Sequence, residues 1–212
     1  MTNAPTARGV RLPRSERRHQ LMSAALEVFV AQGYHSAAMD DIATRAGVSK
    51  PVLYQHFPGK LELYLALLDA SADALVDAVR AALAATHDNK LRVEGTIGAY
   101  FTFVSDEAGA FRLVFESDLT AEPAVRERVE RVTEACAQAV SEVIAEDTDL
   151  RPEAAMLLAA GLTGSAQVAA RWWLTQDGTV PRDAAQQLVS SLAWRGISGF
   201  PRTGEADVDT LG

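Results

Sequence analysis

Cysteine and long apolar runs are nearly absent from this 212-residue chain, and each absence excludes a class of protein. The single thiol, Cys136, cannot form an internal disulfide, which favours a reducing compartment over a secreted disulfide scaffold. Although 48% of the residues are hydrophobic, no apolar run reaches the roughly 18 residues of a membrane span. The first residues also lack the apolar segment of a signal peptide. We therefore predict a cytoplasmic protein without a membrane partner.

Motifs of catalysis and metal binding are missing as well. The four histidines are scattered, at positions 19, 35, 56 and 87, and no Cys/His cluster has the spacing of metal ligands. The chain has no G-x-S-x-G, no glycine-rich phosphate loop and no H-E-x-x-H. We therefore expect no catalytic residues, no metal and no cofactor.

The stretch from residue 39 to residue 60 has the pattern of two short helices joined by a tight turn. Apolar residues at helical spacing predict the first helix over residues 39–46. Gly47 follows at once and can take the left-handed conformation that closes a helix. Val48 can then fill the space between the two helices. This is the outline of a helix-turn-helix.

The second helix of the pair is predicted over residues 50–56. Ser49 stands at its cap position, where the hydroxyl can bond an orphan amide, and Pro51 near the start sacrifices no hydrogen bond. Leu53 and Phe57 are four residues apart and face the first helix. The outer side then carries cationic and hydrogen-bonding side chains: Lys50, Tyr54, Gln55 and His56. Such side chains contact phosphates and base edges in a recognition helix.

These residues resemble a known family. The run I-A-T-R-A-G-V-S-K-P-V-L-Y-Q-H-F-P-G-K, preceded by F-V-A-Q-G-Y, is similar to the DNA-binding domain of TetR-like (TetR/AcrR) transcriptional regulators over about residues 15–65. The resemblance implies an all-α fold, with an N-terminal three-helix DNA-binding domain and a C-terminal helical domain for ligand binding and dimerisation. It further implies a dimer that reads a palindromic operator in the major groove and is released by a small effector.

The distribution of charge is compatible with double-stranded DNA as the partner. The net charge of −8 divides unevenly: residues 1–64 hold eight Lys or Arg against five acidic residues, or +3, which leaves −11 for the remainder. A basic end on an acidic body orients the molecule towards a polyanion. Charge halves also differ by chance, so this observation alone carries little weight.

The resemblance assigns a set of DNA contacts to this chain. The expected contact residues are Arg17, Arg45, Ser49, Lys50, Pro51, Tyr54, Gln55, His56 and Lys60. Phosphate contacts are implied for Arg17 or Arg18 at the start of the first helix, and for the hydroxyl of Tyr54. Lys60 begins the following helix, where an ammonium and the positive helix end together favour a phosphate.

Other positions in this set carry alternatives. Arg45 and Gln55 are candidates for base edges, or are merely solvated. His56 contacts a phosphate or a local backbone carbonyl. Pro51 stands where many relatives have glycine, so an apolar contact, for example with a thymine methyl, replaces a backbone hydrogen bond. Ala37 and Ala38 stand where relatives commonly have Thr or Ser, so the phosphate contact of that hydroxyl is lost here unless Ser36 supplies it.

The whole chain divides into four predicted segments. They are a disordered basic arm over residues 1–14, the DNA-binding domain over 15–60, a helical effector-binding and dimerisation domain over 61–198, and a flexible tail over 199–212. A first helix is predicted from residue 15 to Gln32-Gly33. Beyond residue 60, helices are predicted over 61–86, 90–106, 109–117, 123–146, 152–176 and 181–198.

Two sites are expected in the larger domain. A ligand pocket is predicted from its many large side chains, with Arg112 or Thr133 to orient a polar group: Tyr100, Phe103, Phe111, Arg112, Phe115, Thr133, Met156, Trp172 and Trp173. The alternative is that most of these form ordinary core. A dimer face is predicted where small residues precede an apolar last helix: Gly161, Gly164, Ser165, Leu188, Leu192 and Trp194. The alternative is close packing within one chain.

The sequence thus predicts a homodimeric DNA-binding regulator, with a repressor released by a small, largely apolar ligand as the leading hypothesis. Ligand-independent, corepressed or activating behaviour would use the same fold. A helical small-molecule-binding or interaction protein that no longer reads an operator is the alternative from another class.

Overall fold

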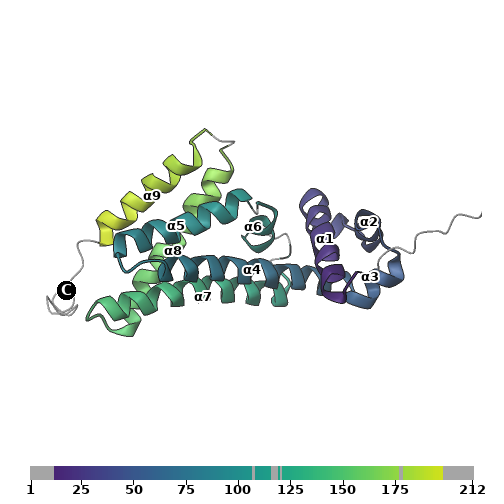
Figure 1. Ribbon diagram of the computed structural model, residues 1–212, viewed down its shortest axis with the longest axis horizontal. Helices are drawn as coiled ribbons and strands as arrows, with labels where there is room; N and C mark the ends of the chain where they lie inside the picture. Colours follow the sequence, from purple (N-terminus) through teal and green to yellow (C-terminus); the bar gives the residue numbers. More distant parts are fainter. Residues whose placement is uncertain (1–11, 107, 116–118, 120, 177–178, 198–212) are drawn as a thin grey trace, which may run out of the picture. The chain divides into compact units, whose positions relative to one another are not determined.

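A computed structural model describes residues 12–106, 108–115, 119, 121–176 and 179–197. Within these residues every regular element is a helix, which confirms the all-α prediction (Figure 1). The helices are α1 (Arg14–Ser36), α2 (Met39–Arg45), α3 (Lys50–His56), α4 (Lys60–Ala84), α5 (Asn89–Asp106), α6 (Ala108–Phe115), α7 (Pro123–Asp147), α8 (Pro152–Leu174) and α9 (Arg182–Ile197). No described helix is long and apolar enough to cross a membrane.

The chain forms two compact units, the head unit up to Leu67 and the body unit from Leu68 onwards. The head unit therefore includes the first two turns of α4, whereas the sequence placed the boundary at residue 60. The reason is packing, because Leu63 and Tyr64 of α4 are buried in the core of the head. The expected tail and residues 1–11 of the expected arm lie outside the described residues, and Arg14 at the end of that arm is already the first residue of α1.

An aromatic cluster closes the core of the head unit. The backbone of α1 leaves helical geometry at Gly33, whose φ of 75° favours glycine, so the regular helix ends where the sequence predicted. Tyr34 follows and packs against Phe29 and Tyr64, with ring centroids 5.9 and 5.1 Å away. The cluster thus fixes the end of α1 against the start of α4.

In the body unit, α7 packs along α8, and α5 packs against α8 and α9. The inner face of α8 carries small side chains: Ala155, Ala159, Thr163, Ala166 and Ala170. Small side chains let helix axes approach closely. The part of α4 that belongs to this unit runs beside α7 (Figure 1). The guanidinium of Arg128 on α7 donates a hydrogen bond of 2.7 Å to Asp69 on α4.

Candidate nucleic-acid interface and ligand pocket

The turn between α2 and α3 is set by the left-handed glycine that the sequence predicted. Gly47 has a φ of 65°, and its N–H donates to the carbonyl of Thr44 at 3.1 Å. The N–H of Val48 reaches back to the carbonyl of Ala43 at 3.0 Å. This pair of bonds is the Schellman closure of a helix, which turns the chain sharply into α3.

The two sides of α3 differ as expected. Leu53 and Phe57 are buried in the head core, while Tyr54 keeps 47% of its surface exposed and Pro51 and Gln55 are exposed. Hydrogen-bonding groups and an apolar ring therefore stand together on an outward helix face. Such a face can contact phosphates and base edges in a major groove.

Ser49 corrects one expectation. It occupies the cap position of α3, but its side chain makes no capping hydrogen bond. Its backbone carbonyl accepts instead, from the N–H groups of Val52 at 3.0 Å and Leu53 at 3.3 Å. The exposed hydroxyl is consequently not committed to capping the helix.

Two of the expected DNA-binding cations are held by neighbouring carboxylates. Lys50 pairs with Asp40 at 2.5 Å, and Arg45 pairs with Glu27 of α1. The hydrogen bond to Asp40 raises the pKa of Lys50, which stays protonated. Because all four side chains are at least half exposed, these ion pairs contribute little to stability and exchange readily. The cations can therefore transfer to phosphates, and sequence reasoning missed the two acidic partners.

A basic hollow lies between the start of α1 and the end of α3. Its volume is about 490 Å³, and it is lined by Leu12, Arg14, Arg17, Val52, Gln55 and His56. The guanidinium of Arg17 donates to Gln20 at 2.7 Å, which positions it beside this hollow. Burial, followed by the arginines at the start of α1, lowers the pKa of His56. A phosphate placed here would meet several cationic donors.

Lys60 differs from its expected role. Its ammonium donates to the carbonyls of Tyr34 at 2.8 Å, His35 at 3.3 Å and Ala37 at 2.8 Å, and it also lies 4.5 Å from the centre of the Tyr34 ring. An ammonium has three protons, so this arrangement uses all of them. With these bonds Lys60 fastens the end of α1 to the start of α4, and its three protons are already used.

Comparisons with known proteins agree with this geometry. The sequence model of the family described as bacterial regulatory proteins, tetR family, matches residues 21–67. The HTH-type transcriptional activator FasR of Mycolicibacterium smegmatis is 48% identical over 196 residues, which covers 92% of this chain and 90% of that protein. This chain belongs to the TetR family.

Solved structures support the same fold for this TetR-family protein. A TetR-like transcriptional regulator from Rhodococcus sp. RHA1 superposes with a TM-score of 0.72 at 27% identity, covering 90% of this chain and all of that one. The regulator FadR from Bacillus subtilis, in complex with stearoyl-CoA, gives a TM-score of 0.68 at 18% identity, covering 86% of this chain and 99% of that one. The TetR-family protein is accordingly a DNA-binding transcriptional regulator and not an enzyme.

The residues predicted to form a ligand pocket are dispersed in the body unit of this regulator. Tyr100 and Phe103 are buried in the core, Thr133 is exposed and bonds the carbonyl of Val129, and 60% of Trp172 is exposed. The ring of Trp173 packs at a tilt against Phe101, and its indole N–H donates to the carbonyl of Val180 at 2.7 Å. Met156 and Phe115 are partly buried, Arg112 is exposed, and the side chain of Phe111 lies outside the described residues.

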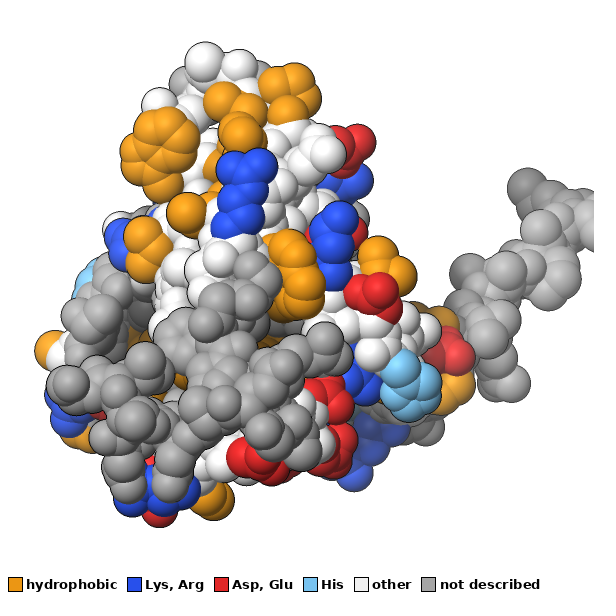
Figure 2. All heavy atoms as spheres, turned by 90° about the vertical axis from the view of Figure 1, so that its left-hand side faces the viewer, with side chains coloured by type: hydrophobic (Ala, Val, Ile, Leu, Met, Phe, Trp, Pro, Cys, Tyr) orange, Lys and Arg blue, Asp and Glu red, His pale blue; other side chains and the backbone are white. Residues whose placement is uncertain are grey.

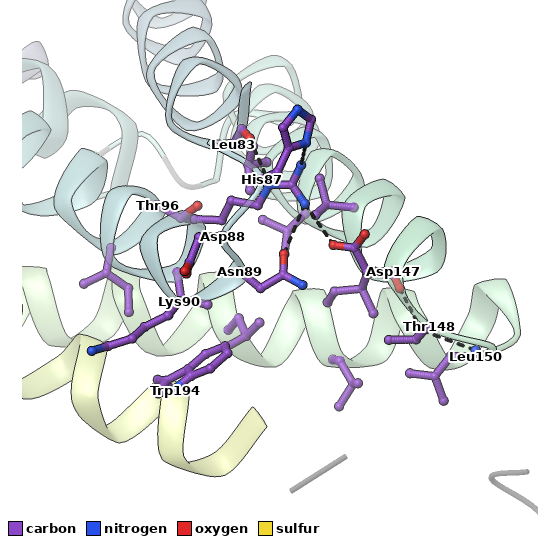
Figure 3. Close-up of a pocket in the computed structure, with 18 residues that line it drawn as sticks. Leu83, His87, Asp88, Asn89, Lys90, Thr96, Asp147, Thr148, Leu150 and Trp194 are labelled. Atoms are coloured by element: carbon purple, nitrogen blue, oxygen red, sulfur yellow. Dashed lines mark hydrogen bonds and ion pairs between the residues drawn. The ribbon is translucent and has the colours of Figure 1, made fainter. Parts of the chain in front are cut away.

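A different pocket is present in the body unit, and none of those nine residues lines it. It has a volume of about 550 Å³ and lies among the end of α4, the start of α5, the end of α7, α8 and Trp194 of α9 (Figure 3). Its walls are largely aliphatic and include Leu83, Val93, Ile97, Ile144, Leu158 and Leu162. No pattern in the sequence predicted this pocket, because its wall comes from five helices.

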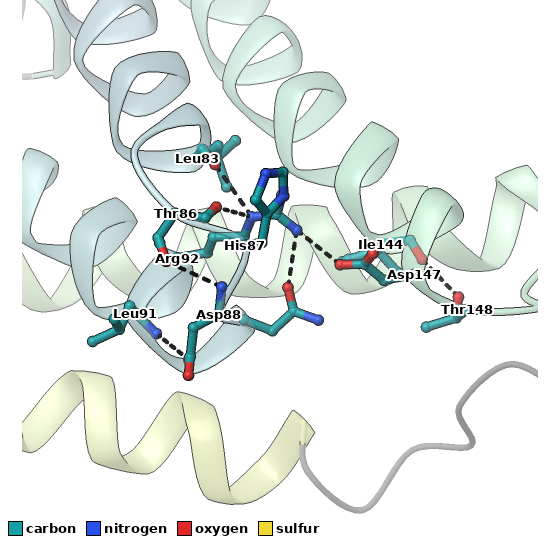
Figure 4. A network of polar contacts seen from close by, with 10 residues as sticks. Leu83, Thr86, His87, Asp88, Leu91, Arg92, Ile144, Asp147 and Thr148 are labelled. Atoms are coloured by element: carbon teal, nitrogen blue, oxygen red, sulfur yellow. Dashed lines mark hydrogen bonds and ion pairs between the residues drawn. The ribbon is translucent and has the colours of Figure 1, made fainter.

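One end of this pocket is closed by a polar network centred on Arg92 (Figure 4). The guanidinium donates to Asp147 at 2.8 Å, to the side chain of Asn89 at 3.1 Å and to the carbonyls of Leu83 and Thr86 at 3.2 and 2.8 Å. Only 11% of the Arg92 side chain is exposed. The network therefore joins the ends of α4 and α7 to the start of α5.

The outer faces of α8 and α9 carry large exposed apolar side chains. Between 60% and 74% of each is accessible: Leu157, Val168 and Trp172 on α8, and Leu188 and Leu192 on α9. Gly161 and Gly164 of α8 have no other atom within 4 Å of the place that a Cβ would take. Figure 2 shows orange apolar side chains over the upper part of the view, which α9 and the end of α8 occupy in Figure 1. Trp194, which was also predicted for the dimer face, lines the pocket.

Proposed function

We propose that this regulator binds an inverted repeat in DNA as a homodimer, activates transcription there and responds to a small, largely apolar ligand. The observation that carries DNA reading is the outer face of α3, where Pro51, Tyr54 and Gln55 are exposed beside the exchangeable cations Lys50 and Arg45. Base edges are read by such side chains, while cations hold the helix to the backbone.

Activation replaces the repression that the resemblance alone suggested. The relative from Mycolicibacterium smegmatis is an activator and aligns over 92% of this chain. That likeness extends through both units, so it supports the same direction of control. Activation requires a bound regulator that raises transcription from a neighbouring promoter.

Dimerisation is supported by the apolar faces of α8 and α9. Five large apolar side chains in water on two neighbouring helices are unusual for a monomer, and open glycine positions allow a second copy to approach closely. Two heads about one turn of DNA apart would then match a palindrome. Replacing Leu188 and Leu192 together by Asp should give a monomer by light scattering, and operator affinity should fall with it.

The function is tested by capturing sheared genomic DNA at about physiological salt, where non-specific binding is weak. We expect a few fragments that share an inverted repeat, and we expect transcription in vitro from one of them to rise when the protein is added. Fragments without a shared repeat would contradict operator reading. A fall in transcription would contradict activation alone, because the same operator would serve a repressor.

Ligand control is a population shift in this proposal. A ligand changes DNA affinity only by the difference between its affinities for the DNA-binding state and the alternative state. The pocket in the body unit has the size and the apolar walls of a small-molecule site. A ligand that binds there and leaves operator affinity unchanged would refute this part of the proposal.

A further inference from the structure

A carboxylate stands beside the first residue of α3, at the end of the helix that is proposed to read DNA. Asp40 lies in the first turn of α2, its side chain is 57% exposed, and it contacts the ammonium of Lys50 at 2.5 Å. Lys50 is the first residue of α3. In helix-turn-helix proteins the N-terminal residues of the second helix contact base edges. Asp40 therefore lies where side chains meet the bases, although the sequence did not place it in the expected contact set.

This carboxylate depends on a partner that DNA can take away. The contact with Lys50 is the one polar contact of the Asp40 side chain in the part of the chain that the structure describes. Because the pair is exposed, Lys50 can exchange Asp40 for a phosphate when the head binds DNA. Asp40 then stands without a counter-charge close to a polyanion. Such a carboxylate lowers DNA affinity unless a hydrogen-bond donor of the DNA meets it.

Few groups of DNA can supply that donor. In the major groove the amines that donate are N4 of cytosine and N6 of adenine, and Asp and Glu characteristically accept from cytosine N4. Adenine presents the N7 acceptor on the same base, which suits an amide side chain that donates and accepts at once. A carboxylate only accepts, so it matches cytosine better than adenine.

From these contacts we infer that Asp40 reads a cytosine in each half-site of the operator, accepting a hydrogen bond from its N4 amine once Lys50 has moved to a phosphate. The two side chains then have different roles. Lys50 contributes affinity for any DNA, and Asp40 restricts tight binding to sequences with cytosine at one position. The inference rests on the proposed function, because it names one base contact within the operator reading proposed above.

The chain provides a matched control next to Asp40. Asp41 is also exposed and also lies in the first turn of α2, but its side chain makes no ion pair or hydrogen bond within the described residues. Asp40→Ala and Asp41→Ala therefore remove the same charge and the same favourable interaction with the start of the helix. Thermal unfolding of both variants checks that the head unit stays folded.

The test begins with selection of binding sites from random double-stranded DNA by the parent protein. Affinities are then measured for all four base pairs at every position of the selected site. We expect the parent to prefer cytosine at one position of each half-site by about 5- to 100-fold, the usual effect of one base contact. Asp40→Ala should reduce this preference to less than about twofold and bind the other sequences at least as well as the parent.

Two further variants separate reading from charge. Lys50→Met should keep the cytosine preference and lose about 0.9 from the slope of log affinity against log salt concentration, whereas Asp40→Ala should keep the slope. Asp41→Ala should keep both. An unchanged preference in Asp40→Ala, a change of equal size at every position, or the loss of a preference for adenine would overturn the inference.

The selection step separates this inference from the proposed function. If the parent protein recovers a shared repeat and Asp40→Ala keeps its preferences, operator reading stands and the role of Asp40 is wrong. If the parent recovers no shared sequence, the proposed function and this inference fail together.

Discussion

Lys60→Met separates the structural role of this lysine from the phosphate contact that the family resemblance implied. The change keeps most of the apolar stem and removes the ammonium that bonds the carbonyls of Tyr34, His35 and Ala37. A hydrogen bond to a charged group contributes about 1.5–3 kcal/mol, and two of the three are 2.8 Å long. Since water reaches part of this site, we expect the head unit to lose about 2–4 kcal/mol.

For a unit of this size, such a loss lowers the unfolding midpoint by roughly 10 °C or more. Thermal unfolding, together with hydrogen exchange in the segment between α1 and α2, measures it. Lys50→Met is the matched control, because it removes an ammonium from an exposed pair with Asp40. We expect the control to keep its stability and lose DNA affinity. An unchanged melting temperature for Lys60→Met, with a weaker salt dependence of DNA binding, would refute the reasoning.

Three further predictions follow from polar groups in the two units. Arg92→Met should lower the free energy of unfolding of the body unit by about 3 kcal/mol, because the buried guanidinium holds three helix ends together. A chemical denaturation curve with an unshifted midpoint would contradict this. Burial and the nearby arginines lower the pKa of His56, so the head unit without DNA should lose stability as pH falls below 6.5, the ordinary value. Operator affinity should rise over the same pH range, because a phosphate favours the protonated ring. His56→Asn should flatten both pH profiles. Burial raises the pKa of the Cys136 thiol, so the native protein should react with a disulfide reagent far more slowly than the urea-unfolded protein, and equal rates would show that the body core is open.

The helix-turn-helix could be predicted from the sequence because its determinants are local. Gly47 and Val48 close α2 within six residues, and the burial of Leu53 and Phe57 follows from helical spacing alone. The role of Lys60 could not be read this way, since its carbonyl partners lie 23 to 26 residues earlier in the chain. The sequence pattern around Lys60 showed only that a cationic residue begins α4.

The pocket of the body unit was even harder to predict from local sequence patterns. Aromatic side chains such as Tyr100 and Phe103 suggested a cavity, but large rings at the centre of a helical unit fill space instead of leaving it. The pocket lies where helix ends meet, beside Arg92 and Thr96, and its position depends on how five helices pack. Small residues on α8 likewise serve two faces, with Ala159 buried inside the chain and Gly161 exposed on the outside.

The central claim, that the outer face of α3 binds operator DNA, is tested most directly by the salt dependence of operator affinity. Each phosphate contact made by a cation contributes a slope of about 0.9 in log affinity against log salt concentration. Lys50→Met should reduce the slope by about this amount, whereas Arg131→Met, which removes an exposed cation paired with Glu127 on α7, should leave it unchanged. Identical slopes for the parent protein and Lys50→Met would contradict the account.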